Sequence, residues 1–327
     1  STIHRTSTIS LTPDEPGAVD VDVTFDVPPN AVELTTTVPE GATVQDTTGF
    51  ERTVDGNYTW DGQGSAPALT MTVPANRTGV GLRAESMSSG YEFVDVGEWA
   101  IVTPPAMSTS WTYRGDAPTF ERTVQTDGPG YAGEQMVYLG QATTYERAAH
   151  GQTFTLVVPD AATLEPDPAA ILDSLEAASL SFRVDERDPS VTFIAAPTTV
   201  DWAASGLAAD ADAWVQADQR LDVANNVWLH EYVHTRTDFR TTEDARWIVE
   251  GSTEYYASLL TLEQGLIGFD AFRDHLALGG RDPYADAVLS RPETWAAGAN
   301  YLKGALVFGT VDREIRVATG SSRSASS

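Results

Sequence analysis

The chain has 327 residues, 47 of them acidic and 20 basic, and its formal net charge is −27 at pH 7. This length allows two or more domains, each with its own hydrophobic core. The negative charge argues against nucleic acid and anionic membrane surfaces as partners. Because the chain has no cysteine, disulfides and thiolate metal sites are excluded, and any metal must bind to His, Asp or Glu.

Nearly all the basic residues are arginine, and Lys303 is the only lysine. The acidic residues are spread along the chain rather than concentrated in one tail. This composition resembles that of proteins from halophilic archaea, whose carboxylate-rich surfaces remain solvated in concentrated salt. An ordinary acidic secreted protein is the alternative interpretation. The halophilic interpretation predicts that stability and activity rise with salt.

Residues 1–115 are predicted to form an antiparallel β-sandwich domain. Polar and apolar residues alternate over 19–27 and 68–73, and Pro and Gly separate such runs. Two N-x-S/T sequons, at Asn57 and Asn76, suit an exported protein. We therefore expect an extracellular or cell-surface location, with the cytoplasm as the alternative.

Residues 116–320 are predicted to form a second, mainly helical domain with a small β-sheet, which makes the whole chain α+β. Residues 321–327 are rich in Ser and are expected to be a flexible tail. No segment is apolar and long enough to cross a bilayer, although an anchor outside this sequence is compatible with it. The spacing of apolar residues predicts strands near 135–139, 153–158 and 190–196, and helices at 169–178, 209–237, 244–263, 268–277 and 298–318.

The strongest motif is HExxH, in which His230 and His234 lie one helical turn apart and Glu231 follows the first histidine. On a helix both imidazoles project from one face and can occupy two neighbouring corners of a zinc tetrahedron. Glu231 then points toward the water that the metal activates. A chance match in a surface helix is the alternative. A metzincin would need a histidine where this chain has Arg240, so that class is excluded.

A catalytic zinc site requires a third protein ligand, and Glu250 is the first choice. Glu250 lies in the segment WIVEGSTEYYA, and fifteen residues separate it from His234. This segment resembles the tryptophan-leucine-x-glutamate-glycine stretch of gluzincin zinc metallopeptidases, namely the alanyl aminopeptidase family and its glycyl aminopeptidase relatives. In that family the glutamate before the glycine is the third zinc ligand, which maps onto Glu250. The interval after the second histidine is somewhat shorter here than is usual in the family.

The resemblance implies roles for two more residues. Glu254 corresponds to a carboxylate that accepts a hydrogen bond from His230 and fixes its tautomer; a solvated helix residue is the alternative. Tyr301 lies in NYLKGALVF, which is similar to the tyrosine-x-lysine-glycine-alanine segment of the same family. The family's tyrosine donates a hydrogen bond to the oxyanion of the tetrahedral intermediate. Core packing is the alternative for Tyr301, and simple solvent exposure is the alternative for Lys303.

The resemblance further implies a thermolysin-like catalytic domain with one Zn²⁺ per chain and a peptide or protein as substrate. Glu231 would take the proton of the attacking water and pass it to the leaving amine. One departure concerns the family's glycine-x-methionine-glutamate-asparagine strand, whose glutamate binds the substrate's amino terminus. The comparable residues 203–210 contain no glutamate, although Asp210 or Asp212 could substitute. Exopeptidase and endopeptidase activity are therefore both open.

Two other functions are compatible with the sequence. One is a catalytically inactive, peptidase-like protein that binds peptides at the cell surface, and the other is a zinc hydrolase of a different amide or ester. The presence of Glu231 argues against the inactive protein, because hydrolysis needs this residue and metal binding does not. No oligomeric state is predicted.

Overall fold

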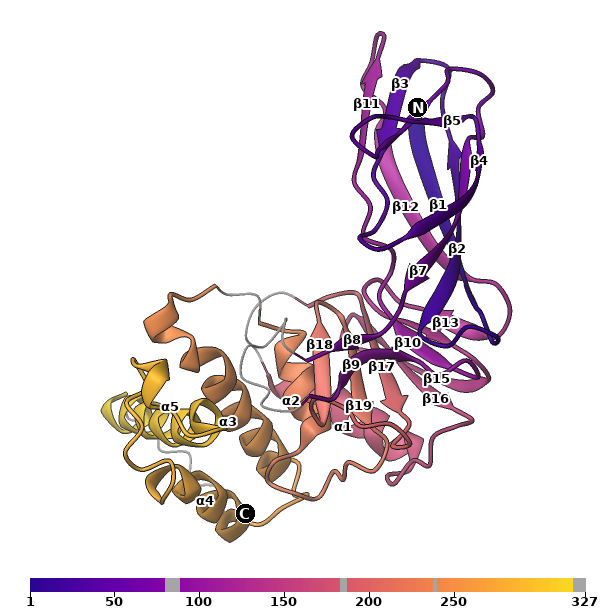
Figure 1. Ribbon diagram of the computed structural model, residues 1–327. Coiled ribbons are helices and arrows are strands. Elements are labelled where there is room, and N and C mark those ends of the chain that lie inside the picture. Colours follow the sequence, from indigo (N-terminus) through magenta and orange to yellow (C-terminus); the bar gives the residue numbers. More distant parts are fainter. Residues whose placement is uncertain (80–88, 183–186, 238–239, 320–327) are drawn as a thin grey trace. The chain divides into compact units, whose positions relative to one another are not determined.

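The computed structural model describes residues 1–79, 89–182, 187–237 and 240–319, and the chain divides into two compact units (Figure 1). The first unit contains residues 1–78, 90–143 and 159–161, and the second contains residues 79–89, 144–158 and 162–327. The mixed α+β class predicted from the sequence is confirmed. The domain boundary expected near residue 115 falls inside the first unit, and the tail at 321–327 lies outside the described residues.

The first unit is built from β-sheets that enclose one hydrophobic core. Along β2 (Ala18–Asp26) the side chains of Val21 and Phe25 are buried, whereas the intervening Asp22 is exposed. This alternation places one face of the strand on the core. Phe50, from another sheet, meets Phe25 edge to face with ring centroids 5.5 Å apart. The alternating apolar residues therefore form the interior of the first unit.

Among the described strands of the first unit, pairing is antiparallel except between β1 (Thr2–Leu11) and β12 (Thr119–Thr126). These two strands pair in parallel over eight residues, from Thr2 opposite Thr119 to Ile9 opposite Thr126. The described pairs within residues 1–115 are antiparallel, as the sequence predicts. The parallel partner β12 lies at residues that were expected to belong to the second domain, and that assignment of β12 differs from the structure.

The sheets of the first unit have the strand orders β12-β1-β2-β7-β4, β11-β3-β6-β5 and β13-β14-β10-β9-β8. Their remaining strands are β3 (Ala31–Thr36), β4 (Thr43–Thr48), β5 (Phe50–Arg52), β6 (Tyr58–Trp60), β7 (Ala68–Pro74), β8 (Arg77–Thr78), β9 (Tyr91–Asp95), β10 (Ala100–Val102), β11 (Thr109–Tyr113), β13 (Gly130–Ala132) and β14 (Val137–Leu139).

The second unit combines one five-stranded sheet with helices (Figure 1). The sheet order is β15-β16-β17-β19-β18, in which β16, β17 and β19 are parallel and β18 is an antiparallel edge strand. Buried residues of the central strands, of α1 and of α2 form a single core cluster. The strands are β15 (Ala142–Ala149), β16 (Gln152–Pro159), β17 (Ser190–Ala196), β18 (Gly206–Ala209) and β19 (Asp212–Gln216). The helices are α1 (Pro168–Ser181), α2 (Val227–His234), α3 (Trp247–Glu263), α4 (Phe269–Ala277) and α5 (Ala299–Ala318), with short 3₁₀ turns at Glu243–Ala245, Leu278–Gly280 and Pro292–Thr294.

Three of the helices expected at the C-terminal end match α3, α4 and α5, but the helix expected at 209–237 is wrong. Its first part is the hairpin of β18 and β19, and only α2 is helical. Asp210 adopts a positive φ of 47° in the two-residue turn between Ala209 and Asp212, which a helix does not allow. Trp214 lies fully buried in β19, between β17 and β18. The alanine-rich sequence of this segment therefore led to a predicted helix where the structure has a short buried hairpin.

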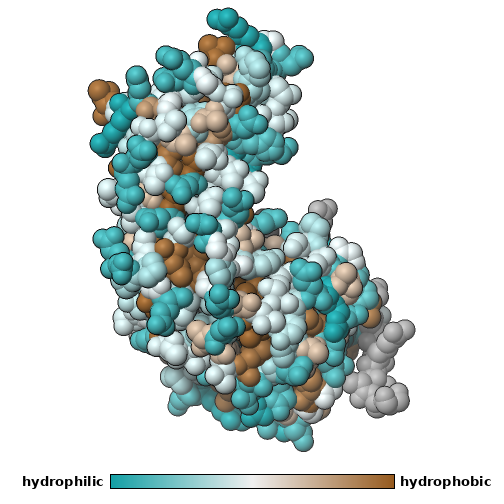
Figure 2. Space-filling model, turned by 90° about the vertical axis from the view of Figure 1, so that its right-hand side faces the viewer, coloured by the Kyte–Doolittle hydropathy of each residue, from teal (hydrophilic) through white to brown (hydrophobic). Residues whose placement is uncertain are grey.

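The face shown in Figure 2 carries mainly polar residues, with small apolar patches between them. Among the described residues, each helix is too short or too polar to span a bilayer.

Candidate metal centre

α2 presents the two histidines of the HExxH motif on one face. Asn226 caps the helix, because its side chain accepts a hydrogen bond from the backbone N–H of Leu229 at 3.2 Å. Trp228 and Tyr232 are fully buried in the core of the second unit. This packing orients α2 so that His230 and His234, one turn apart, share a different face of the helix.

The third candidate ligand enters from α3. Glu250 lies in the first turn of this helix and is buried. The next residue, Gly251, allows α3 to approach α5 very closely: a Cβ added at Gly251 would lie 2.7 Å from the Cα of Gly304. Alanine at either position would therefore push the two helices apart. The glycine that follows Glu250 in the motif thus has a packing role in this fold.

The structure brings three ligand atoms together in a small triangle. Nε2 of His230 lies 3.1 Å from Nε2 of His234 and 3.3 Å from Oε2 of Glu250, and the His234–Glu250 distance is 3.1 Å. These residues are the one group of possible metal ligands found among the described residues. Ligands about 2.0–2.1 Å from zinc at tetrahedral angles lie about 3.3 Å from one another. The donor set and its spacing therefore fit a zinc ion.

The local electrostatics also favour a cation. Burial alone would lower the pKa of His230, but hydrogen bonds with Glu250 and Glu254 and the charge of Glu231 raise this pKa to about 10. Glu254 lies 2.9 Å from Nδ1 of His230, and a carboxylate can only accept a hydrogen bond. The hydrogen of Nδ1 therefore points to Glu254, and Nε2 faces the triangle. When the ring loses a proton to bind a metal, this hydrogen bond keeps the remaining hydrogen on Nδ1 and leaves Nε2 as the ligand atom.

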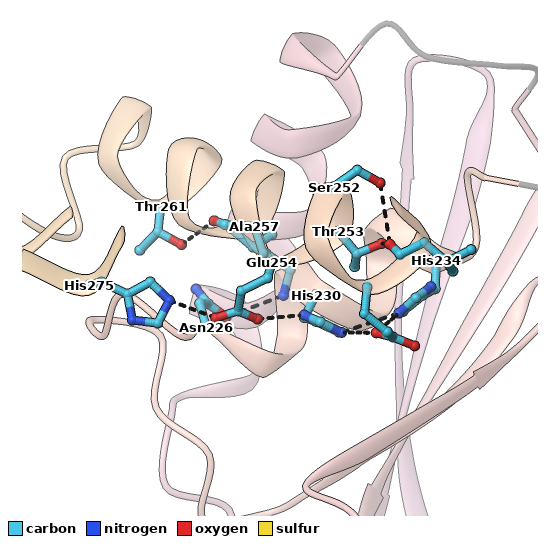
Figure 3. Close-up of polar contacts among 12 residues, drawn as sticks. Asn226, His230, His234, Ser252, Thr253, Glu254, Ala257, Thr261 and His275 are labelled. Carbon is cyan, nitrogen blue, oxygen red and sulfur yellow. Dashed lines mark hydrogen bonds and ion pairs between the residues drawn. The ribbon is translucent and has the colours of Figure 1, made fainter. Parts of the chain in front are cut away.

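Glu254 has a second histidine partner that sequence reasoning missed. Its Oε1 accepts a hydrogen bond from Nε2 of His275 at 2.7 Å (Figure 3). Burial would raise the pKa of Glu254, but the hydrogen bonds from His230 and His275 outweigh burial and lower it to about 2. Glu254 is therefore a buried anion, and the exposed alternative is wrong. His275 lies in a short helix outside the motifs, and no spacing signal points to it.

Glu231, the candidate general base, lies on α2 next to the first histidine and is 2% exposed. It packs against the edge strand β18: a Cβ added at Gly206 would lie 2.7 Å from Cγ and 2.8 Å from Oε1 of Glu231. A larger residue at this position would displace the carboxylate. The sequence analysis considered residues 203–210 only because they contain no glutamate where the family has one. The close approach of Gly206 to Glu231 was not predicted.

Tyr301, the candidate oxyanion donor, lies on α5. Its ring stacks on that of His230 with centroids 5.7 Å apart and an angle of 20° between the planes. Lys303, two residues later, donates hydrogen bonds from Nζ to the backbone carbonyls of Ala285 and Ala287, both at 2.6 Å. The lysine therefore attaches the preceding loop to α5 rather than simply facing solvent.

No protein-family model and no curated protein matches this sequence. The fold is nevertheless similar to that of zinc peptidases among solved structures. An aminopeptidase N family protein from Idiomarina loihiensis shares 14% identity and a TM-score of 0.58, over 98% of this chain and 68% of that chain. An M1 zinc metallopeptidase from Deinococcus radiodurans shares 15% identity and a TM-score of 0.52, over 94% and 81%. A substituted two-domain M1 zinc metallopeptidase bound to L-tryptophan shares 13% identity and a TM-score of 0.54, over 96% and 82%. At these identities the comparison shows a shared fold.

Proposed function

We propose that the chain is a zinc-dependent peptidase whose metal is held by His230, His234 and Glu250. The observation that carries this proposal is the triangle of three ligand atoms, 3.1–3.3 Å apart, with the buried Glu231 next to His230 on α2. The fold shared with M1 zinc metallopeptidases supports it. We extend the proposal to one zinc ion per chain and to a thermolysin-like arrangement of α2 and α3 around the ion.

Each residue of the site has a chemical task in this proposal. Zinc, when bound, supplies a Lewis acid that polarises the scissile carbonyl and lowers the pKa of water. Glu231 accepts the proton of the attacking water and delivers it to the leaving amine. The hydroxyl of Tyr301 donates a hydrogen bond to the carbonyl oxygen as negative charge develops there. Glu254 holds the ring of His230 in the orientation that ligation requires.

The variant Glu231→Gln tests this assignment. It removes the base but none of the three candidate ligands, so turnover of a peptide library should fall by about 100-fold or more while zinc content stays at the wild-type level. The same substitution at the exposed Glu243 is the matched control and should change neither quantity. Unchanged turnover in Glu231→Gln would contradict the proposal. Bound zinc without turnover on any peptide in the wild type would instead favour a binding protein, and turnover on another amide or an ester would favour a different hydrolase.

The edge strand β18 determines which peptides to test first. Its four residues, Gly206–Ala209, carry no carboxylate; Asp210 is exposed in the hairpin turn, and Asp212 is buried on β19. We therefore propose that cleavage does not require a free amino terminus at the substrate. Matched peptides with free and acetylated amino termini should be cleaved at similar rates. Loss of cleavage on acetylation would instead support an aminopeptidase and would point to one of the two aspartates.

A further inference from the structure

Glu254 uses both of its carboxylate oxygens, and the two partners lie on different helices. Oε2 accepts from Nδ1 of His230 at 2.9 Å, and Oε1 accepts from Nε2 of His275 at 2.7 Å. Figure 3 shows the three side chains in a row, with Glu254 between the two rings. The side chains are 8–10% exposed. Water therefore has little access to replace either hydrogen bond.

His275 comes from α4, a surface helix that provides no candidate ligand. Within this helix Phe272 is the one buried residue, and its ring packs on Tyr255 with centroids 6.2 Å apart. Tyr255 follows Glu254 on α3. Phe272 and His275, three residues apart on the same face of α4, therefore both contact α3.

A buried carboxylate with one partner would be poorly held. Its unused oxygen would lose the hydrogen bond that offsets its desolvation, and the carboxylate group would be free to rotate. The hydrogen bond to His230 would then weaken, and with it the control over which ring nitrogen carries the hydrogen. His275 prevents this, because it holds one oxygen while the other faces His230.

We propose that His275 is a positioning residue, which completes the hydrogen-bonded chain His275–Glu254–His230 and thereby fixes the ring of His230 for metal binding. This inference rests on the proposed zinc site. It adds a residue outside the sequence motifs, because it proposes that α4 contributes to the affinity for the metal. The hydrogen bond of His275 is made to Glu254 and not to a proposed ligand atom, so His275 acts on the metal only through Glu254.

The test is the zinc affinity of full-length variants, measured at one pH by competition with a chelator of known affinity. His275→Leu removes the hydrogen bond and should weaken zinc binding about 10- to 100-fold, in line with the loss of other residues that orient metal ligands. His275→Gln places an amide N–H near the position of Nε2 and should restore the affinity to within about threefold of wild type. In the Co²⁺-loaded proteins, the visible absorption spectrum of His275→Gln should stay close to that of the wild type, and the spectrum of His275→Leu should differ more.

Two controls separate positioning from general damage. His4 lies 3.4 Å from Glu121 in the first unit, with both side chains largely exposed, so His4→Leu is the same chemical change and should leave zinc affinity unchanged. In a Glu254→Gln background, His275→Leu should cause little further loss, because both residues act along one chain. If His275→Leu does not fold, His275→Asn is the second variant: it stays polar, but its shorter side chain places no N–H at the position of Nε2.

The outcomes are distinct. Wild-type zinc affinity in a folded His275→Leu or His275→Asn variant would overturn the role of His275 and leave the zinc site intact. Full additivity with Glu254→Gln would overturn it too, since the two residues would then act independently. A wild-type chain that binds no zinc would overturn the proposed function itself, and this inference with it.

Discussion

The ring of Tyr301 on α5 lies almost parallel to the ring of His230 on α2, with centroids 5.7 Å apart. This stacking places a phenol beside a proposed metal ligand. The close approach of α3 and α5 at Gly251 and Gly304 helps to hold α5, and therefore Tyr301, near the site. The packing of an aromatic ring and the position of its hydroxyl are thus separate properties of one residue, and a single substitution can distinguish them.

Tyr301→Phe keeps the ring and removes the hydroxyl. We expect zinc content to be unchanged and kcat/KM to fall by about 100- to 1,000-fold, the usual effect of losing one oxyanion donor. Steady-state kinetics and elemental analysis on the same samples measure both. Tyr113→Phe, at an exposed position of the first unit, is the control. Unchanged kcat/KM in Tyr301→Phe would mean that Tyr301 only packs against His230.

Gly206→Ala tests the position of the general base. The added Cβ would lie 2.7 Å from Cγ of Glu231 and 2.8 Å from Cγ1 of Val227, so the carboxylate must move. A displacement of this size should lower kcat by about 100-fold, while zinc content stays at the wild-type level. Gly280→Ala, which would meet Leu306 at an ordinary 3.5 Å, is the matched control. Wild-type kcat in Gly206→Ala would show that Glu231 need not lie against β18.

The raised pKa of His230 predicts how zinc binding depends on pH. In metal-free protein this pKa is about 10, against an ordinary value of 6.5. Its contribution to stability is therefore fully present below pH 6.5 and is lost as pH rises through about 10. Zinc needs the neutral imidazole, so binding at pH 8 should release about one proton per ion, and affinity should rise with pH.

Calorimetry in two buffers of different ionisation enthalpy measures the proton release. Glu254→Gln removes a negative charge that raises the pKa of His230, and this variant should release fewer protons. Zinc affinity independent of pH between 7 and 9, with no proton release, would contradict the expected coupling.

The sequence predicts the candidate site better than it predicts the fold around it. The spacing of His230 and His234 is a local pattern that places both side chains on one face of a single helix, and Glu250 was identified through the resemblance of its segment to the gluzincin motif. His275 gives no such signal, because its contact with Glu254 depends on how α4 packs on α3. The close approach of Gly206 to Glu231 likewise arises only when β18 lies beside α2.

The difference between local patterns and contacts of distant segments also explains the errors in the predicted fold. Alternation in β2 predicts a sheet because one face of a strand is buried and the other is solvated. β19 is buried on both sides, so Ala213, Trp214 and Val215 show no alternation and resemble a helix segment. The parallel pairing of β1 with β12 joins residues more than one hundred positions apart, which no local pattern reports.

The most direct test of the account is the zinc content of the wild type and of Glu250→Ala, determined by elemental analysis of protein purified in high salt. We predict close to one zinc ion per wild-type chain, and a large loss of zinc in the variant because one of three protein ligands is gone. A wild-type chain that contains no zinc after reconstitution, or a Glu250→Ala variant that binds zinc as tightly as the wild type, would contradict the proposed metal centre.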